Sequence, residues 1–144
     1  MKSVAQLLKV KGTRVHSIAP SASVLDCLKL FAEKSIGAAL VMEGDRLVGI
    51  FTERDQARKV ALQDTSSRDR TVRDVMTLDV LWVGPDRTNE ECMALMTEKR
   101  IRHLPVMEGG KVIGIISIGD LVKDIIAEQQ FVIEQLEHYI MGER

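Results

Sequence analysis

The sequence has few of the residues that mark disulfide-rich, metal-binding or membrane proteins. Aromatic residues make up 3% of the 144 residues, and there are three prolines and two cysteines. Cys27 and Cys92 form no Cys-x-x-Cys pair, so we expect buried core thiols rather than a redox motif or zinc knuckle. The three histidines share no metal-binding spacing, and no apolar run approaches the ~18 residues of a membrane helix. We therefore expect neither a metal site nor a membrane span.

The sequence also lacks an excess of either charge, since it has 20 basic and 21 acidic residues and a net charge of −1. Without a basic excess, nucleic acid is not expected as the main partner. The motifs G-x-G-x-x-G, G-x-x-x-x-G-K-[ST] and G-x-S-x-G are absent, so an enzyme is not expected either. The first ten residues form no secretory signal, which predicts a cytoplasmic protein.

What the chain does contain is an internal repeat. Residues 24–60 align with residues 89–125 at a constant offset and without a gap. Cys27 matches Cys92, and the run Val41-Met42-Glu43-Gly44 is repeated as Val106-Met107-Glu108-Gly109. Because chance similarity would not keep one register over that length, we interpret the chain as two fused copies of one unit.

Each copy predicts the order strand, helix, strand, strand, helix. The first strands are expected at 14–18 and 80–83, and the helices after Pro20 and Pro85, whose following residues supply caps. Hairpins are expected at 38–52 and 103–117, with turns at Gly44-Asp45 and Gly109-Gly110. Closing helices are expected at 53–63 and from 118 onward. Because such a unit buries little core alone, we predict an α+β fold of two pseudo-symmetric units packed sheet to sheet.

This pattern divides the chain into four parts. Residues 1–63 are the first unit with a short lead helix, 64–70 a polar linker, and 71–127 the second unit. Residues 128–144 extend the last helix, whose apolar stripe continues to Ile140. We expect its far half, with Phe131, Leu136 and Tyr139, to pack on a second subunit and form a homodimer. The alternative is a helix folded back on its own domain.

One short run stands at the same place in both units. Gly49-Ile50-Phe51-Thr52-Glu53-Arg54-Asp55 corresponds to Gly114-Ile115-Ile116-Ser117-Ile118-Gly119-Asp120. We call these the first and second Gly-to-Asp runs. Each places a hydroxyl where a strand meets a helix and a carboxylate three residues later, which fits a capping box without any ligand. The same geometry suits a nucleotide, because a helix start attracts phosphate and a carboxylate accepts ribose hydroxyls.

Two units with these runs resemble a tandem pair of CBS domains, also called a Bateman module. His103-Leu104-Pro105-Val106 is similar to the most typical stretch of that family, and Val75-Met76-Thr77 to its usual lead-in. The final helix resembles that of small stand-alone bacterial members. The resemblance implies a regulatory, non-catalytic protein that binds an adenine nucleotide (AMP, ATP, or NAD or NADH) in clefts between the units. It also implies a protein partner that responds to the ligand.

The resemblance further implies which residues contact the ligand. Asp55 and Asp120 would hold ribose hydroxyls, and Thr52 and Ser117 would lie near phosphates. The starts of the second strands would contact adenine; they comprise Ile36, Gly37 and Ala38 in one unit and Ile101, Arg102, His103, Leu104 and Pro105 in the other, with Ser35 and Arg100 preceding them. Gly12, Thr13 and Thr77 would close over the base. With so few aromatic residues, aliphatic packing is expected to hold the adenine.

The two predicted sites are unequal. The first carries Arg54, a good phosphate partner, where the second has Ile118-Gly119. The second unit instead has Arg100, Arg102 and His103 near its hairpin, and these could reach the phosphate of either site; the alternative is a solvated, charged helix end. Two other functions stay open, namely a structural dimer whose runs are only caps, and an enzyme acting on nucleotides.

Overall fold

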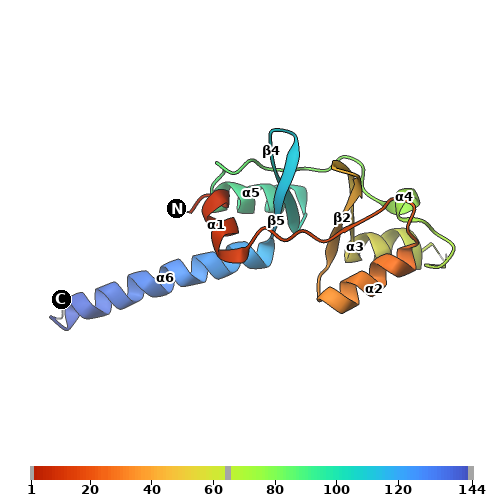
Figure 1. Cartoon of the computed structure of the whole chain (residues 1–144). Coiled ribbons are helices and arrows are strands. Elements are labelled where there is room, and N and C mark those ends of the chain that lie inside the picture. Colours follow the sequence, from red (N-terminus) through yellow and green to blue (C-terminus); the bar gives the residue numbers. More distant parts are fainter. Residues whose placement is uncertain (1, 64–65, 143–144) are drawn as a thin grey trace.

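The chain folds as two small α+β units followed by one long helix (Figure 1). The computed structural model describes residues 2–63 and 66–142, so residues 64 and 65 of the predicted linker lie outside the described part. The elements are α1 (Val4–Lys11), β1 (Ser17–Ile18), α2 (Val24–Lys34), β2 (Ala38–Glu43), β3 (Arg46–Thr52), α3 (Glu53–Asp55), the π-helix η1 (Gln56–Ala61), α4 (Val72–Val75), α5 (Asn89–Lys99), β4 (His103–Glu108), β5 (Lys111–Ser117) and α6 (Ile118–Ile140).

Both hairpins form as predicted and share one register. In β2–β3 Ala38 pairs with Thr52, and in β4–β5 His103 pairs with Ser117. Each hairpin shifts register at the same place, between Val41 and Met42 or Val106 and Met107. The turn glycines adopt positive φ, with 59° at Gly44 and 58° and 78° at Gly109 and Gly110, which confirms the predicted tight turns.

The first strand of each unit is much shorter than expected. Ser17–Ile18 pairs in parallel with β2, whereas in the second unit Val83 alone bridges to Val106. Val83 holds this bridge with two backbone hydrogen bonds, to the carbonyl of Pro105 at 3.1 Å and from the N–H of Met107 at 3.0 Å. The preceding Trp82 is 55% exposed, and the strand expected at 80–83 is reduced to this one bridge.

Capping side chains set the ends of the helices. Ser23 and Thr88 accept hydrogen bonds from the third backbone N–H of α2 and α5, as predicted for the residues after Pro20 and Pro85. The helix expected at 53–63 begins at Glu53 but winds as a π-helix from Gln56 to Ala61. Widened turns of this kind are common at functional sites.

The lead helices are exchanged between the units. Val4, Leu7 and Leu8 of α1 are buried in the core of the second unit, whereas α4 packs in the core of the first. Figure 1 accordingly shows α1 beside α5 and β5, away from α2. The sequence division placed α1 with the first unit. In the structure Leu8 instead packs on β5 of the second unit, where a Cβ on Gly114 would lie 2.7 Å from its side chain.

The two sheets meet through an apolar cluster. Ala38, Leu40 and Ile50 of the first unit are buried, and Val112 and Ile115 of β5 pack against the same cluster. Burying one such side chain contributes about 1.5–3 kcal/mol, so this contact ties the units together. It also fixes the separation between the start of α3 and the end of α5.

The long helix α6 runs well past the body of the molecule (Figure 1). It begins at Ile118 and ends at Ile140, in agreement with the extension predicted from the apolar stripe. Its far half leaves apolar side chains in solvent, including Phe131 at 62% and Tyr139 at 83% exposure. Across residues 2–63 and 66–142, the structure contains no helix with both the length and the hydropathy to cross a bilayer.

Candidate functional site

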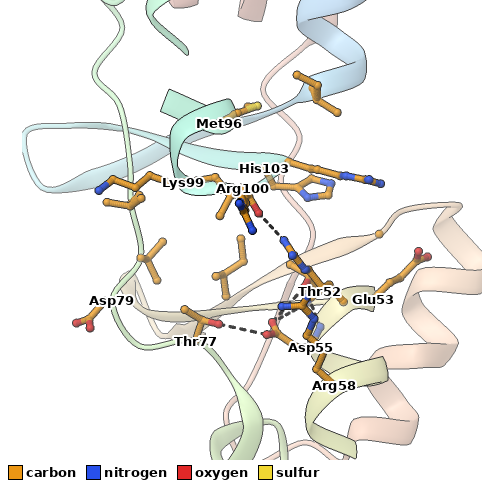
Figure 2. Close-up of a pocket in the computed structure, with 18 of the residues that line it drawn as sticks. Thr52, Glu53, Asp55, Arg58, Thr77, Asp79, Met96, Lys99, Arg100 and His103 are labelled. Atoms are coloured by element: carbon orange, nitrogen blue, oxygen red, sulfur yellow. Dashed lines mark hydrogen bonds between the residues drawn. The ribbon is translucent and has the colours of Figure 1, made fainter. Parts of the chain in front are cut away.

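A cleft of about 1160 Å³ opens between the two units (Figure 2). One wall is the junction of β3 and α3, with Thr52 and Asp55 of the first Gly-to-Asp run. The facing wall is the end of α5 and the start of β4, from Lys99 to His103. Segment 77–81, which leads into the second unit, lines a further side. The apolar contact between the sheets places these walls opposite each other.

Asp55 both caps the helix and faces the cleft. Its Oδ2 accepts a hydrogen bond from the Thr52 backbone N–H at 3.0 Å, and the Thr52 hydroxyl accepts one from the Asp55 N–H at 3.2 Å. Its Oδ1 accepts from the Thr77 hydroxyl at 3.3 Å and lies 3.2 Å from Lys59 Nζ. The capping box therefore exists, but it occupies one carboxylate oxygen. The other oxygen meets side chains that also line the cleft (Figure 2).

Arg54 connects the two units across the cleft. Its Nη1 donates to the carbonyl oxygen of Arg100, drawn as a dashed line in Figure 2. Arg100 can present that carbonyl because it ends α5 in the left-handed conformation, with φ of 55°. The guanidinium of Arg54 is thus held where both walls of the cleft converge.

Positive charge dominates the lining. The basic residues are Arg54, Arg58, Lys59, Lys99, Arg100 and Arg102, and the acidic ones Glu53, Asp55 and Asp79, so six minus three leaves three positive charges. Burial, together with the charges of Lys11 and Arg102, lowers the pKa of His103 although Asp120 opposes this, so His103 is neutral at pH 7. Ile50, Val80 and Ile101 add apolar surface. This combination suits an anion that also carries an apolar ring.

Half of the predicted site residues line this cleft. They are Gly37, Thr52, Arg54, Asp55, Thr77, Arg100, Ile101, Arg102 and His103. The basic residues of the second unit therefore face the first Gly-to-Asp run, one of the two arrangements considered from the sequence. Lys99, Arg100 and Arg102 are exposed to solvent and also line the cleft, so the structure is compatible with both alternatives.

The other predicted residues lie outside this lining. Ala38, Leu104 and Pro105 are buried, and Ser35 ends α2 in the left-handed conformation that Arg100 adopts in the second unit. Ile36 packs against the first core. Gly12 and Thr13 follow α1.

Ser117 and Asp120 form the second capping box, at the start of α6. Asp120 Oδ2 accepts from the Ser117 backbone N–H at 2.8 Å and also lies 2.6 Å from Lys11 Nζ. Burial by itself raises the pKa of the Asp120 carboxyl, but hydrogen bonds from Lys11 and Ser117 more than offset this, so the pKa lies below its usual value. Asp120 is therefore ionised at neutral pH.

Sequence reasoning missed several residues of the cleft. Arg58 and Lys59 were not identified, although Lys59 follows Asp55 by one helical turn and the i, i+4 spacing could have indicated the pair. Lys99 and Asp79 also line the cleft. No local pattern could have found Lys11, because it meets a carboxylate 109 residues away.

The chain belongs to the CBS domain family. The family model matches residues 9–55 and 72–127, which covers both units. A mitochondrial CBS domain-containing protein of Arabidopsis thaliana, CBSX3, is 38% identical over 125 residues. That match takes in 83% of this chain but 61% of the plant protein, so the chain spans about three fifths of this relative.

Solved structures agree with the fold. A candidate signal-transduction protein with CBS domains from Burkholderia ambifaria superposes with a TM-score of 0.86 at 53% identity, covering 89% of this chain and 96% of that one. A hexameric CBS-CP12 protein from bloom-forming cyanobacteria gives a TM-score of 0.74 at 30% identity, covering 85% and 70%. Both are similar to this chain over its two units.

Proposed function

We propose that this protein is a non-catalytic regulatory module that senses an adenine nucleotide, of the AMP, ATP or NAD type, in the cleft between its two units. One observation carries the proposal. Asp55 lies across a cleft of about 1160 Å³ from three basic residues of the other unit, Lys99, Arg100 and Arg102. A nucleoside phosphate offers the matching groups, namely ribose hydroxyls at one end and negative charge at the other.

Each group of residues then has a separate task. Asp55 accepts the ribose hydroxyls through Oδ1, where the Thr77 hydroxyl now donates. Arg54, Arg58 and Lys59 neutralise phosphate from the wall of the first unit, and Arg100 and Arg102 do so from the second. The aliphatic residues of the cleft, rather than an aromatic ring, cover the base.

Signalling would follow from the position of the cleft. A ligand that contacts both walls binds most tightly when the walls are close, so it shifts the population toward one arrangement of the two units. A partner protein that binds only that arrangement would then respond to the concentration of the nucleotide. This fits the signal-transduction role suggested for the Burkholderia relative.

A second copy of the chain is the expected structural partner. The far half of α6 exposes Phe131, Leu136 and Tyr139, an apolar stripe too large for a solvated helix. We propose that two chains pair through this stripe to form a homodimer. The hexameric cyanobacterial relative supports assembly of such units into larger particles.

Titration calorimetry of the full chain with AMP, ATP and NAD tests the proposed ligand class. The nucleotide that binds should lose about tenfold or more in affinity with Asp55→Ala, since a hydrogen bond to a charged group contributes about 1.5–3 kcal/mol. Asp45→Ala, in an exposed hairpin turn, is the matched control and should leave Kd unchanged. No heat with any nucleotide, or an unchanged Kd for Asp55→Ala, contradicts the proposal and favours a purely structural dimer.

A further inference from the structure

We propose that Lys11 closes the second Gly-to-Asp run to nucleotide, so that each chain takes one nucleotide, at Asp55. The proposal rests on the function proposed above and adds which of the two equivalent positions is used. It makes Lys11, a residue outside both repeats, the specificity determinant.

Lys11 is held at two points beside Asp120. Its Nζ lies 2.6 Å from Asp120 Oδ2 and donates to the carbonyl oxygen of Ile115 at 2.7 Å. The backbone that carries it is fixed, because Leu7 and Leu8 of α1 are buried in the second core. At the other end of α1, Lys2 pairs with Asp124 of α6 at 3.0 Å. The ammonium is therefore placed by a packed helix rather than by a loose side chain.

The first unit fills the same place with a neutral residue. There the backbone N–H of Thr77 donates to the carbonyl of Ile50 at 2.8 Å, and its hydroxyl donates to Asp55 at 3.3 Å. Ile115 and Asp120 are the repeat equivalents of these two acceptors. In the second unit one ammonium group contacts both residues, at the Ile115 carbonyl and at Asp120 Oδ2, the oxygen that also accepts the Ser117 N–H. Lys11 thus stands where Thr77 stands in the first unit, between the strand carbonyl and the carboxylate, and adds a full positive charge.

A difference in the lead helices produces this substitution. Leu8 packs on Gly114 as Met76 packs on Gly49. After Met76 the helix has ended and Thr77 runs as an extended segment beside β3. After Leu8, α1 continues to Lys11, which removes the extended backbone and brings the lysine side chain into its place.

The consequence for a ligand follows from charge. A ribose hydroxyl that approaches Asp120 must compete with the Lys11 ammonium, which already holds this carboxylate at 2.6 Å, whereas in the first unit it meets the neutral hydroxyl of Thr77. Asp55 also meets an ammonium, that of Lys59, at 3.2 Å. That lysine belongs to the same helical segment and lines the cleft, so its charge remains available to the phosphate when the ribose binds. Neither Ser117 nor Asp120 lines that cleft.

Binding stoichiometry tests the proposal. The full chain is titrated with AMP, ATP and NAD by calorimetry, and the nucleotide that binds should occupy one site in the natural sequence and in Lys9→Met, a control in the last turn of the same helix. Lys11→Met keeps the aliphatic length and should give two sites, and Lys11→Met with Asp120→Asn should return to one. Two sites in the natural sequence, or one site in Lys11→Met, overturns the proposal while leaving the proposed function intact. Absence of binding in every variant with all three nucleotides overturns both.

A second measurement needs no nucleotide, and it uses two variants of Lys11 so that the result does not depend on one of them folding. Side-chain NMR titration should show the pKa of Asp120 and of His103 rise in Lys11→Met and in Lys11→Gln, because the ammonium now lowers both, whereas Lys9→Met should leave both unchanged. Unchanged pKa values would mean that Lys11 does not hold Asp120 in solution and would contradict the proposal.

Discussion

Arg54 is the residue whose removal should separate recognition of the phosphate from recognition of the nucleoside. It reaches from α3 to the carbonyl of Arg100 in the facing wall, so it stands where a phosphate would lie. Arg54→Gln should weaken ATP binding by about tenfold, the loss of one charge-assisted contact, while adenosine binding changes little. Calorimetric comparison of the two ligands checks this. An equal loss for both would show that Arg54 acts on the shape of the cleft and not on the phosphate.

The cysteines give a test at the residue scale that needs no ligand. Burial raises the pKa of the Cys27 thiol to about 12 and that of Cys92 to about 11. Both thiols are therefore protonated at pH 8 and should react with a disulfide reagent far more slowly in the native protein than in urea. Because the folded pKa values are raised, stability should also decrease as pH rises above about 9, where unfolded thiols ionise. Fast labelling of the native protein would contradict the burial of these thiols.

At the scale of single elements, the second capping box should set the stability of α6. Ser117 accepts the N–H of Asp120 at the start of this 23-residue helix. Ser117→Ala should lower the free energy of unfolding by about 1 kcal/mol, the usual contribution of an N-cap. Urea denaturation measures it, with Ser21→Ala in an exposed turn as the control. Equal stability of the two variants would mean that the hydroxyl does not cap α6.

Local sequence patterns predicted most elements correctly, and long-range contacts explain the differences. The hairpins are determined by alternating apolar residues and by turn glycines, all within 15 residues, so their bounds could be read from the repeat. The exchange of α1 and α4 between units depends on Leu8 meeting Gly114 across more than 100 residues, and nothing local encodes it. The π-helix at Gln56–Ala61 likewise has no signal in the apolar spacing.

The candidate site was likewise predictable where local patterns determine it and not where long-range contacts do. The repeated runs indicated Thr52 and Asp55, and the comparison of the copies indicated that Arg100 and Arg102 supply charge. Which run they face depends on how the two sheets pack, and this required the structure. Lys11 was missed because its role depends on one extra turn of α1 and on a contact that spans almost the whole chain.

At the scale of the whole molecule, the exposed half of α6 should control assembly. Deleting residues 129–144 removes Phe131, Leu136 and Tyr139 while leaving both cores complete. Light scattering should then change from the mass of a dimer to that of a monomer. Phe131→Glu should have the same effect in the full chain, and Gln129→Glu, on an exposed position of the same helix, should not. An unchanged dimer after deletion would place the subunit contact elsewhere.

We expect a nucleotide to bridge the two units at the first Gly-to-Asp run. A crystal structure of the full chain grown with ATP tests it most directly. We predict density for one nucleotide per chain, with its ribose on Asp55 and its phosphates between Arg54 and Arg102, and with the Lys11–Asp120 ion pair intact. A nucleotide bound on Asp120 with Asp55 unoccupied, or a cleft that stays empty with ATP, AMP and NAD alike, would contradict the proposed function.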